Sequence, residues 1–230
     1  DPETGRPVET ENARYQVTSP LVDLPLEEQI ATLGAMTAEQ IEAAFHKPGP
    51  LGGHNWHPMS YSPDTGYVYI PALDMPYGYG NEPEFTYEEG RWNLANDWRL
   101  NMPSGDKGVD DKVDGLLRGF VSAWDPVAQK EVWRIQHAGT WNGGMLSTHG
   151  NLLFQGNSSG RFAAYRADTG EELWSAPAQT GILAPPVSYE IDGEQYVTVV
   201  AGWGGAFALT AAAAEGYNLK PRGRILTYKL

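Results

Sequence analysis

The sequence predicts an all-β protein built from repeated antiparallel sheets, and three observations support this prediction. The 230 residues include 27 glycines, 17 prolines and 11% aromatic residues, a composition typical of short strands joined by tight turns. Short β-branched and aromatic runs recur along the chain. One segment of the sequence also returns at a fixed distance, which indicates a repeat architecture.

The repeat consists of AWDPVAQKEVW (123–133) and AYRADTGEELW (164–174), which begin 41 positions apart. Each copy begins with Ala, ends with Trp at the eleventh position and contains an Asp and a turn, and in the second copy this turn joins two expected strands. This period suits one blade of a β-propeller. We expect Trp133 and Trp174 to wedge between neighbouring sheets and dock the blades. DPETG (1–5) matches the turn of an earlier copy, which predicts that the chain begins inside a blade.

Other elements follow from local patterns. TAEQIEAAFHK predicts one short helical insertion at about 37–47, because Thr37 and Gln40 form a capping box. The tract 75–114 is polar and aromatic-rich, and it is predicted to be a long irregular loop. Its acidic run, 106–115, fails the spacing of an EF-hand and is interpreted as a solvated loop. Strands are expected at 66–72, 118–124, 150–156, 161–166, 171–175, 186–191, 194–203 and 224–230.

Charge and composition exclude several classes of function. The net charge of −13 repels phosphate backbones and anionic membrane surfaces, so nucleic acid is not an expected partner. Apolar stretches are far shorter than the roughly 18 residues that a spanning helix needs, so no membrane span is predicted. The absence of Cys excludes disulfides, thiolate metal sites and covalent haem attachment within this sequence.

Three tryptophans stand beside glycine or asparagine in similar settings: Trp56 in GGHNWHP, Trp141 in TWNGGM and Trp203 in VAGWGGAF. Glycine allows a flat ligand to approach the backbone, indole provides stacking area, and the amides of Asn55 and Asn142 can bind oxygens. One planar, oxygen-rich ligand would satisfy all of these groups.

The two histidines of GGHNWHP leave alternatives open. His54 and His57 are close enough in sequence to chelate zinc, but a zinc site needs a third protein ligand. They can instead form hydrogen bonds to the backbone at the entrance to a strand.

Several long motifs resemble one family. They are GGHNWHPMSYSPDTGYVYIPA, RGFVSAWDPVAQKEVWR, WNGGMLSTHGNLLFQGNSSGRFAAYRADTGEELW and YVTVVAGWGGAF, with DPETGRPVE near the start. Together they resemble the pyrroloquinoline-quinone (PQQ) dependent alcohol dehydrogenases, which are eight-bladed β-propeller quinoproteins. The resemblance is nearest to the quinohaemoprotein type. It implies about three to four blades from the C-terminal part of such a propeller, without the cytochrome domain.

The resemblance implies a periplasmic enzyme that oxidises alcohols to aldehydes or ketones with PQQ held beside Ca²⁺. Asn55, Trp56 and Trp141 match motifs that contact PQQ, and Trp203 and Gly204 are further candidates. In the family, the catalytic Asp and the calcium ligands precede the DPETG region. We therefore expect this segment to supply no catalytic or metal-binding residue, to form one wall of the PQQ pocket and to be inactive alone.

The implied partners are a small-molecule alcohol, the missing propeller blades and a cytochrome or other electron acceptor. The missing blades would come from the same parent chain or from a second subunit.

An alternative is a non-enzymatic PQQ-repeat propeller scaffold of the bacterial envelope. Such a scaffold would share the A-x-D-x-x-x-G-x-x-x-W repeat, but it has no reason to keep HNWHPM or WNGG. A second alternative is a degenerate remnant whose pocket residues serve only packing.

Overall fold

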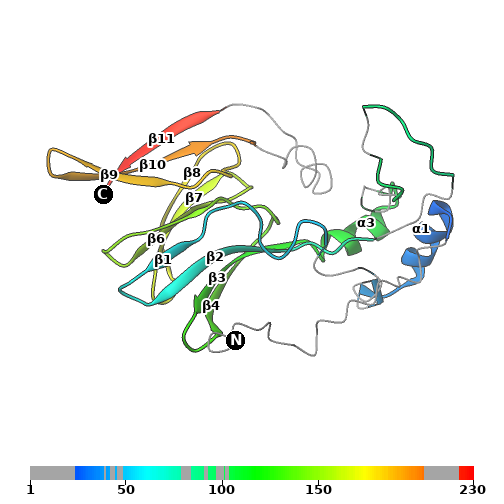
Figure 1. Ribbon diagram of the computed structural model, residues 1–230, viewed down its shortest axis with the longest axis horizontal. Coiled ribbons are helices and arrows are strands. Elements are labelled where there is room, and N and C mark those ends of the chain that lie inside the picture. Colours follow the sequence, from blue (N-terminus) through cyan, green and yellow to red (C-terminus); the bar gives the residue numbers. More distant parts are fainter. Residues whose placement is uncertain are drawn as a thin grey trace.

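The computed structural model describes residues 24–38, 40, 41, 45, 49–78, 84–90, 93–96, 101, 104–204 and 223–230. These residues form three antiparallel sheets that fan out side by side (Figure 1). The first sheet has the order β1 (Ser60–Ser62), β2 (Tyr67–Asp74), β3 (Arg118–Asp125), β4 (Lys130–His137). The second has β5 (Met145–Ser147), β6 (Leu152–Gly156), β7 (Arg161–Arg166), β8 (Glu172–Pro177). The third has β9 (Val187–Ile191), β10 (Glu194–Ala201), β11 (Arg224–Lys229).

The two copies of the sequence repeat fold in the same way. Ala123 pairs with Trp133 across β3 and β4, and Ala164 pairs with Trp174 across β7 and β8. In both hairpins the register shifts directly after the alanine. The repeat therefore marks the two outer strands of consecutive blades, and the all-β prediction of three to four propeller blades is confirmed.

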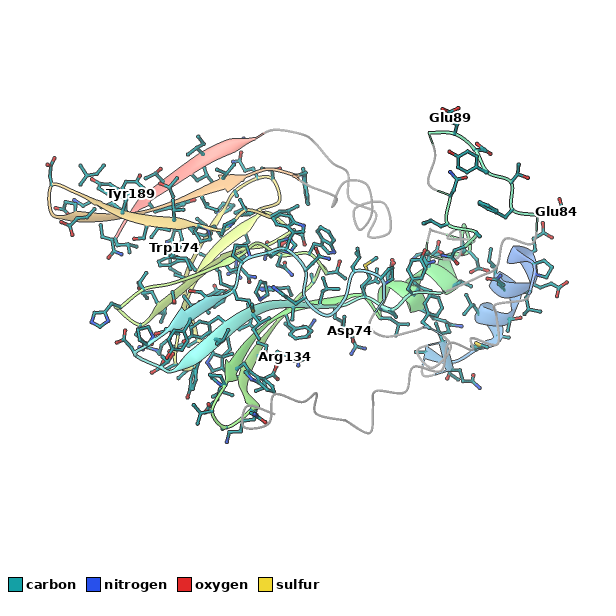
Figure 2. All side chains as sticks on the ribbon, viewed as in Figure 1. Asp74, Glu84, Glu89, Arg134, Trp174 and Tyr189 are labelled. Atoms are coloured by element: carbon teal, nitrogen blue, oxygen red, sulfur yellow. The ribbon has the colours of Figure 1, made fainter. Side chains whose placement is uncertain are left out.

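The tryptophans that end each repeat dock one sheet on the next, as predicted. A Cβ on Gly170, in the turn between β7 and β8, would lie 2.8 Å from Cε3 of Trp133 on β4. Trp174 on β8, which is labelled in Figure 2, contacts Tyr228 on β11, with ring centroids 4.9 Å apart. Each indole thus lies at the contact between its own sheet and the following one.

Strands β6 and β7 of the second sheet are buried on both faces because they carry mostly apolar residues at successive positions. On β7, Ala163 and Tyr165 pack toward the first sheet, while Phe162 and Ala164 pack toward the third. A hydrogen bond of 2.9 Å from the Tyr69 hydroxyl to the Ala167 carbonyl joins the first two sheets. Tight packing on both faces gives the sheets a fixed relative position.

The outer face of the third sheet is apolar and exposed. Val200 pairs with Ile225, and Tyr196 pairs with Tyr189, so these side chains share one face. Exposed fractions reach 52% for Val200 and 74% for Ile225. Val187 and Ile191, on the same face of β9, are exposed as well. The opposite face, with Val197 and Val199, is buried against the second sheet.

Helices lie at one end of the molecule, beyond the sheets (Figure 1). The capping box expected at 37–47 forms, because the Thr37 amide donates to Gln40 Oε1 (2.8 Å) and the Gln40 amide donates to Thr37 Oγ1 (3.3 Å). The prediction of a single helical insertion was wrong, since α1 (Leu26–Ala35) and α3 (Lys107–Asp114) are also helical. The apolar spacing of Leu26, Ile30 and Leu33 was a signal for α1.

The acidic run 106–115 is a helix rather than the predicted solvated loop. Asp106 caps α3 by accepting hydrogen bonds from the amides of Gly108 (2.8 Å) and Val109 (3.2 Å). Val109 and Val113 lie four residues apart and face the helical core cluster, which also contains Leu116. The high charge concealed this apolar stripe, and part of the tract 75–114 therefore has regular structure.

The predicted turn at 1–5 lies outside the described residues. Within the part of the chain that the structure describes, no helix is both long and apolar enough to cross a membrane.

Candidate functional site

The loop 51–58, which precedes β1, is anchored on both sides. The Leu73 amide donates to the Gly53 carbonyl (2.9 Å), and His54 Nδ1 lies 2.8 Å from the Pro71 carbonyl oxygen, so β2 supports the loop. The Met145 amide of β5 donates to the Pro58 carbonyl (2.9 Å). The loop that carries Asn55 and Trp56 is therefore fixed to the first and second sheets at once.

WNGG interlocks with this loop through its glycines. A Cβ on Gly144 would lie 2.7 Å from Cδ of Pro58, and a Cβ on Gly143 would lie 3.0 Å from the carbonyl oxygens of Ala184 and Gly156. Side chains at these positions would push the segments apart. Gly144 therefore allows the Trp141 segment to lie directly against the loop 51–58, and Gly143 allows it to lie against the backbone at Gly156 and Ala184.

A network of polar side chains also holds the WNGG segment. Gln155 Nε2 donates to the Gly143 carbonyl (2.8 Å), and Gln155 Oε1 lies 2.7 Å from Nε2 of His137 on β4. Because the Gln155 amide nitrogen must face the carbonyl, its oxygen accepts the proton of His137 Nε2. Burial, which is the largest effect, lowers the pKa of His137. The network thus joins the first sheet to WNGG.

The third sheet contributes Trp203, which follows β10. The Gly202 amide donates to the Gly181 carbonyl (2.7 Å), and Gly181 lies against the Trp203 ring where no Cβ would fit. Trp203 and Trp141 belong to one apolar cluster with Leu73 and Leu183. Each of the three sheets therefore provides one tryptophan to the same region: Trp56, Trp141 and Trp203.

Three rings pack on one another in this region. Trp56 stacks on His57, with centroids 4.1 Å apart and an angle of 24° between the planes. Trp141 meets His57 edge-on at 5.3 Å and meets Trp56 at 6.4 Å. Trp141 is 1% exposed and His57 2% exposed, whereas Trp56 is 50% exposed. The stack therefore presents the Trp56 indole to the outside and buries the two rings that support it.

His57 is held as a neutral imidazole. Burial, with a smaller contribution from the charge of His54, lowers its pKa to about 4. Its Nε2 atom is buried and has no hydrogen-bond partner among the described residues.

The predicted site residues come together, although their environments differ. Asn55 donates from Nδ2 to the Leu51 carbonyl (2.9 Å) and accepts from the Trp56 amide (2.9 Å), which uses one hydrogen and one lone pair of an amide that has two of each. Gly204 is exposed, and no described atom would lie within 4 Å of a Cβ there. Trp141, in contrast, is covered by its neighbours.

Two residues singled out by sequence have local structural roles. Asn142 is buried and donates to the Gly139 carbonyl (3.0 Å), while its Oδ1 accepts from the Ser158 amide (3.3 Å), so its amide stabilises the loop. His54 bonds to the backbone at the strand, which was one of the two alternatives for it. The described residues include no cluster of three His, Asp or Glu side chains that could hold a metal ion.

The chemistry of this arrangement is that of a binding surface. A half-exposed indole offers a flat face for stacking, the Asn55 amide offers a donor and an acceptor, and exposed backbone at Gly204 allows close approach. Behind them, the buried apolar cluster of Trp141, Leu73 and Leu183 excludes water.

Comparisons with known proteins identify relatives of the chain. Residues 118–197 match the family model described as glucose/ethanol/alcohol dehydrogenase, β-propeller domain (PQQ). Quinohemoprotein alcohol dehydrogenase ADH IIB of Pseudomonas putida is 40% identical over 230 residues, which is 99% of this chain and 28% of that protein. The 1-butanol dehydrogenase (cytochrome c) of Thauera butanivorans is 41% identical over 80% of this chain and 26% of its own length.

A solved structure shows the same fold. The quinohemoprotein alcohol dehydrogenase ADHIIG from Pseudomonas putida HK5 superposes with a TM-score of 0.72 at 45% identity, over 80% of this chain and 27% of that one. The chain thus spans about a quarter of the length of the relatives it matches, in their C-terminal part. It belongs to the PQQ-dependent (quinoprotein) alcohol dehydrogenase family.

Proposed function

We propose that the chain forms one wall of the PQQ pocket of an alcohol dehydrogenase that oxidises alcohols to aldehydes or ketones. The observation that carries this proposal is the meeting of Trp56, Trp141 and Trp203, one from each of three consecutive sheets, beside Asn55. Blade packing alone does not require this meeting, because Trp133 and Trp174 already dock the sheets.

The residues present fit a planar quinone with several oxygens. Trp56 offers a half-exposed ring, Asn55 retains one amide hydrogen that its two local bonds do not use, and no described atom closes the space at Gly204. PQQ supplies a quinone that accepts hydride from an alcohol. The chain's own contribution is to stack on the ring, to donate to an oxygen and to keep water from its far side. The buried Trp141 supports Trp56, since the two rings meet edge to face with centroids 6.4 Å apart.

The catalytic base and the calcium ligands are proposed to lie on other blades. The exposed apolar face of the third sheet supports this proposal, because Val187, Val200 and Ile225 resemble the residues buried between the described sheets. Those blades would belong to the same protein or to a second subunit. Alone, the chain is proposed to be inactive.

Location and electron acceptor are proposed from the relatives. One relative is named a quinohemoprotein and another a 1-butanol dehydrogenase (cytochrome c), which supports a cytochrome as the electron acceptor. A periplasmic location is proposed on the basis of the same relatives.

A chimera tests the proposal. In ADH IIB, the segment that this chain matches would be replaced by this chain, and dye-linked alcohol oxidation would be measured with PQQ and Ca²⁺. The proposal predicts turnover by the chimera and none by the isolated chain. A chimera that folds, judged by circular dichroism and gel filtration, but neither binds PQQ nor oxidises alcohols would favour a scaffold or a remnant. Failure of the chimera to assemble would contradict the proposed place of the chain in the propeller.

A further inference from the structure

We infer that His57 is a positioning residue, whose ring holds the Trp56 indole at the angle needed for a planar ligand. The inference rests on the proposed function, since Trp56 is the ring face that the PQQ pocket would use. It adds a role for a side chain that neither the sequence motifs nor the comparisons assign.

The geometry between the two rings is the first step. Trp56 and His57 are neighbours in sequence, yet their rings are stacked 4.1 Å apart and nearly parallel. Consecutive side chains usually point in different directions. A sharp bend between them is therefore required, and it is fixed by the bonds of Asn55 to the Leu51 carbonyl and to the Trp56 amide.

The second step concerns what holds His57 itself. Pro58 restricts the backbone of the residue before it to extended conformations. Gly144 packs on the Pro58 ring, and the Trp141 ring closes the edge of the imidazole at 5.3 Å and 87°. His57 is therefore clamped between a fixed backbone and a buried indole. Among the described residues, Trp56 has ring contacts with His57 and Trp141, and it is His57 that stacks face to face with this half-exposed indole.

The third step is the state of the imidazole. His57 is 2% exposed, and no hydrogen bond to its Nε2 is present among the described residues. A buried polar atom without a partner costs stability, so packing alone would favour an apolar ring or chain. The low pKa of His57 keeps the ring uncharged, and a neutral aromatic ring is suited to stacking. The positioning role is therefore assigned to the aromatic face of the His57 ring.

Two substitutions distinguish the effect of the aromatic face of His57 from the effect of its volume. His57→Phe keeps an aromatic face, whereas His57→Leu keeps an apolar side chain and removes that face. His149→Leu is the control, because His149 is an exposed partner of Asp64, at 92% side-chain exposure, and lies outside the ring stack. Near-ultraviolet circular dichroism of the chain reports the fixed geometry of the indoles, and PQQ affinity is measured in the chimera with ADH IIB.

We expect His57→Leu to lose part of the near-ultraviolet tryptophan signal and to weaken PQQ binding about tenfold, as one aromatic pair would. His57→Phe should restore both to near the unsubstituted protein, and His149→Leu should change neither. Equal losses in the Leu and Phe variants, or a PQQ affinity unchanged in His57→Leu, would overturn the inference.

A further measurement needs no substitution. Nuclear Overhauser contacts between the His57 and Trp56 ring protons are expected in the unsubstituted chain, and their absence would overturn the inference even if His57→Leu fails to fold. These contacts and the dichroism do not depend on PQQ. If the unsubstituted chimera fails to bind PQQ while they are present, the proposed function fails and the positioning role stands.

Discussion

Gly170 lies directly beneath the indole of Trp133, so a Cβ at this position would come within 2.8 Å of the ring. Gly170 also has a φ of +75°, which L side chains rarely adopt. We predict that Gly170→Ala lowers the free energy of unfolding by about 3 kcal/mol, combining backbone strain with the clash. Gly193→Ala is the control, because Gly193 has a φ of +80° and open space around it. In denaturant titrations it should lose only about 1 kcal/mol, and equal losses would show that the contact contributes nothing.

Gly144 tests the interlock between WNGG and the loop 51–58. Its Cβ would meet Pro58 at 2.7 Å, so Gly144→Ala should displace the Trp141 segment and weaken PQQ binding by the chimera about tenfold or more. Gly53→Ala, in the same loop, meets no described atom within 4 Å and should bind PQQ as before. Unchanged affinity in Gly144→Ala would mean that the position of the Trp141 segment does not matter for the ligand.

Lys112 connects the two helices at the end of the molecule. Its Nζ donates to the carbonyls of Gly34 and Met36, both at 2.9 Å, where α1 leaves carbonyl groups unpaired. Lys112→Met should cost about 1 kcal/mol and increase hydrogen exchange in α1. Lys130→Met, at the exposed start of β4, is the comparison and should leave α1 protected. Unaltered exchange in Lys112→Met would show that the helix end is stabilised by other groups.

Stability should fall as the pH is lowered from 7 toward 4. His57 and His137 have lowered pKa values in the folded protein because of burial, and that of His57 is about 4. In the unfolded chain, both histidines bind protons near pH 6.5. Between pH 6.5 and the lowered pKa values, the unfolded chain therefore holds more protons than the folded chain. The free energy of unfolding rises with pH over that range. Below pH 4, the lowered pKa of His57 reduces the free energy of unfolding by roughly 3 kcal/mol relative to pH 7.

His57→Phe isolates this contribution. The unfolding free energy of the variant should depend less steeply on pH between 6.5 and 4 than that of the unsubstituted chain. His149→Leu, at an exposed position, should keep the original slope. If the slope of His57→Phe is unaltered, His57 is not buried neutral in the folded state.

The blades could be predicted from sequence because their signals are local and periodic. Ala123 to Trp133 and Ala164 to Trp174 each define a hairpin, and the register confirms both. The short inner strands β1 and β5 were missed, since three residues such as Ser60–Ser62 carry no period and pair only after the sheets assemble. The helix α3 was missed because the charges around Val109 and Val113 outweighed their helical spacing.

Sequence motifs indicated candidate residues for the site but not their arrangement. Asn55, Trp56, Trp141 and Trp203 were identified by type and motif, and the structure brings them together. The exposure of each ring depends on tertiary packing, so no sequence pattern indicates that Trp141 is covered or that His57 stacks on Trp56. The full use of the Asn142 amide within its own loop was equally hidden.

The affinity of PQQ for the chimera with and without the Trp56 side chain tests the central claim most directly. Trp56→Ala removes the exposed indole of the ring stack. Trp174→Ala, which removes a docking residue of the second sheet, serves as the comparison. In equilibrium titrations with Ca²⁺ present, we expect Trp56→Ala to raise the Kd of PQQ at least tenfold and Trp174→Ala to leave it nearly unchanged. An unaltered Kd in Trp56→Ala would contradict the claim that these sheets form a wall of the quinone pocket.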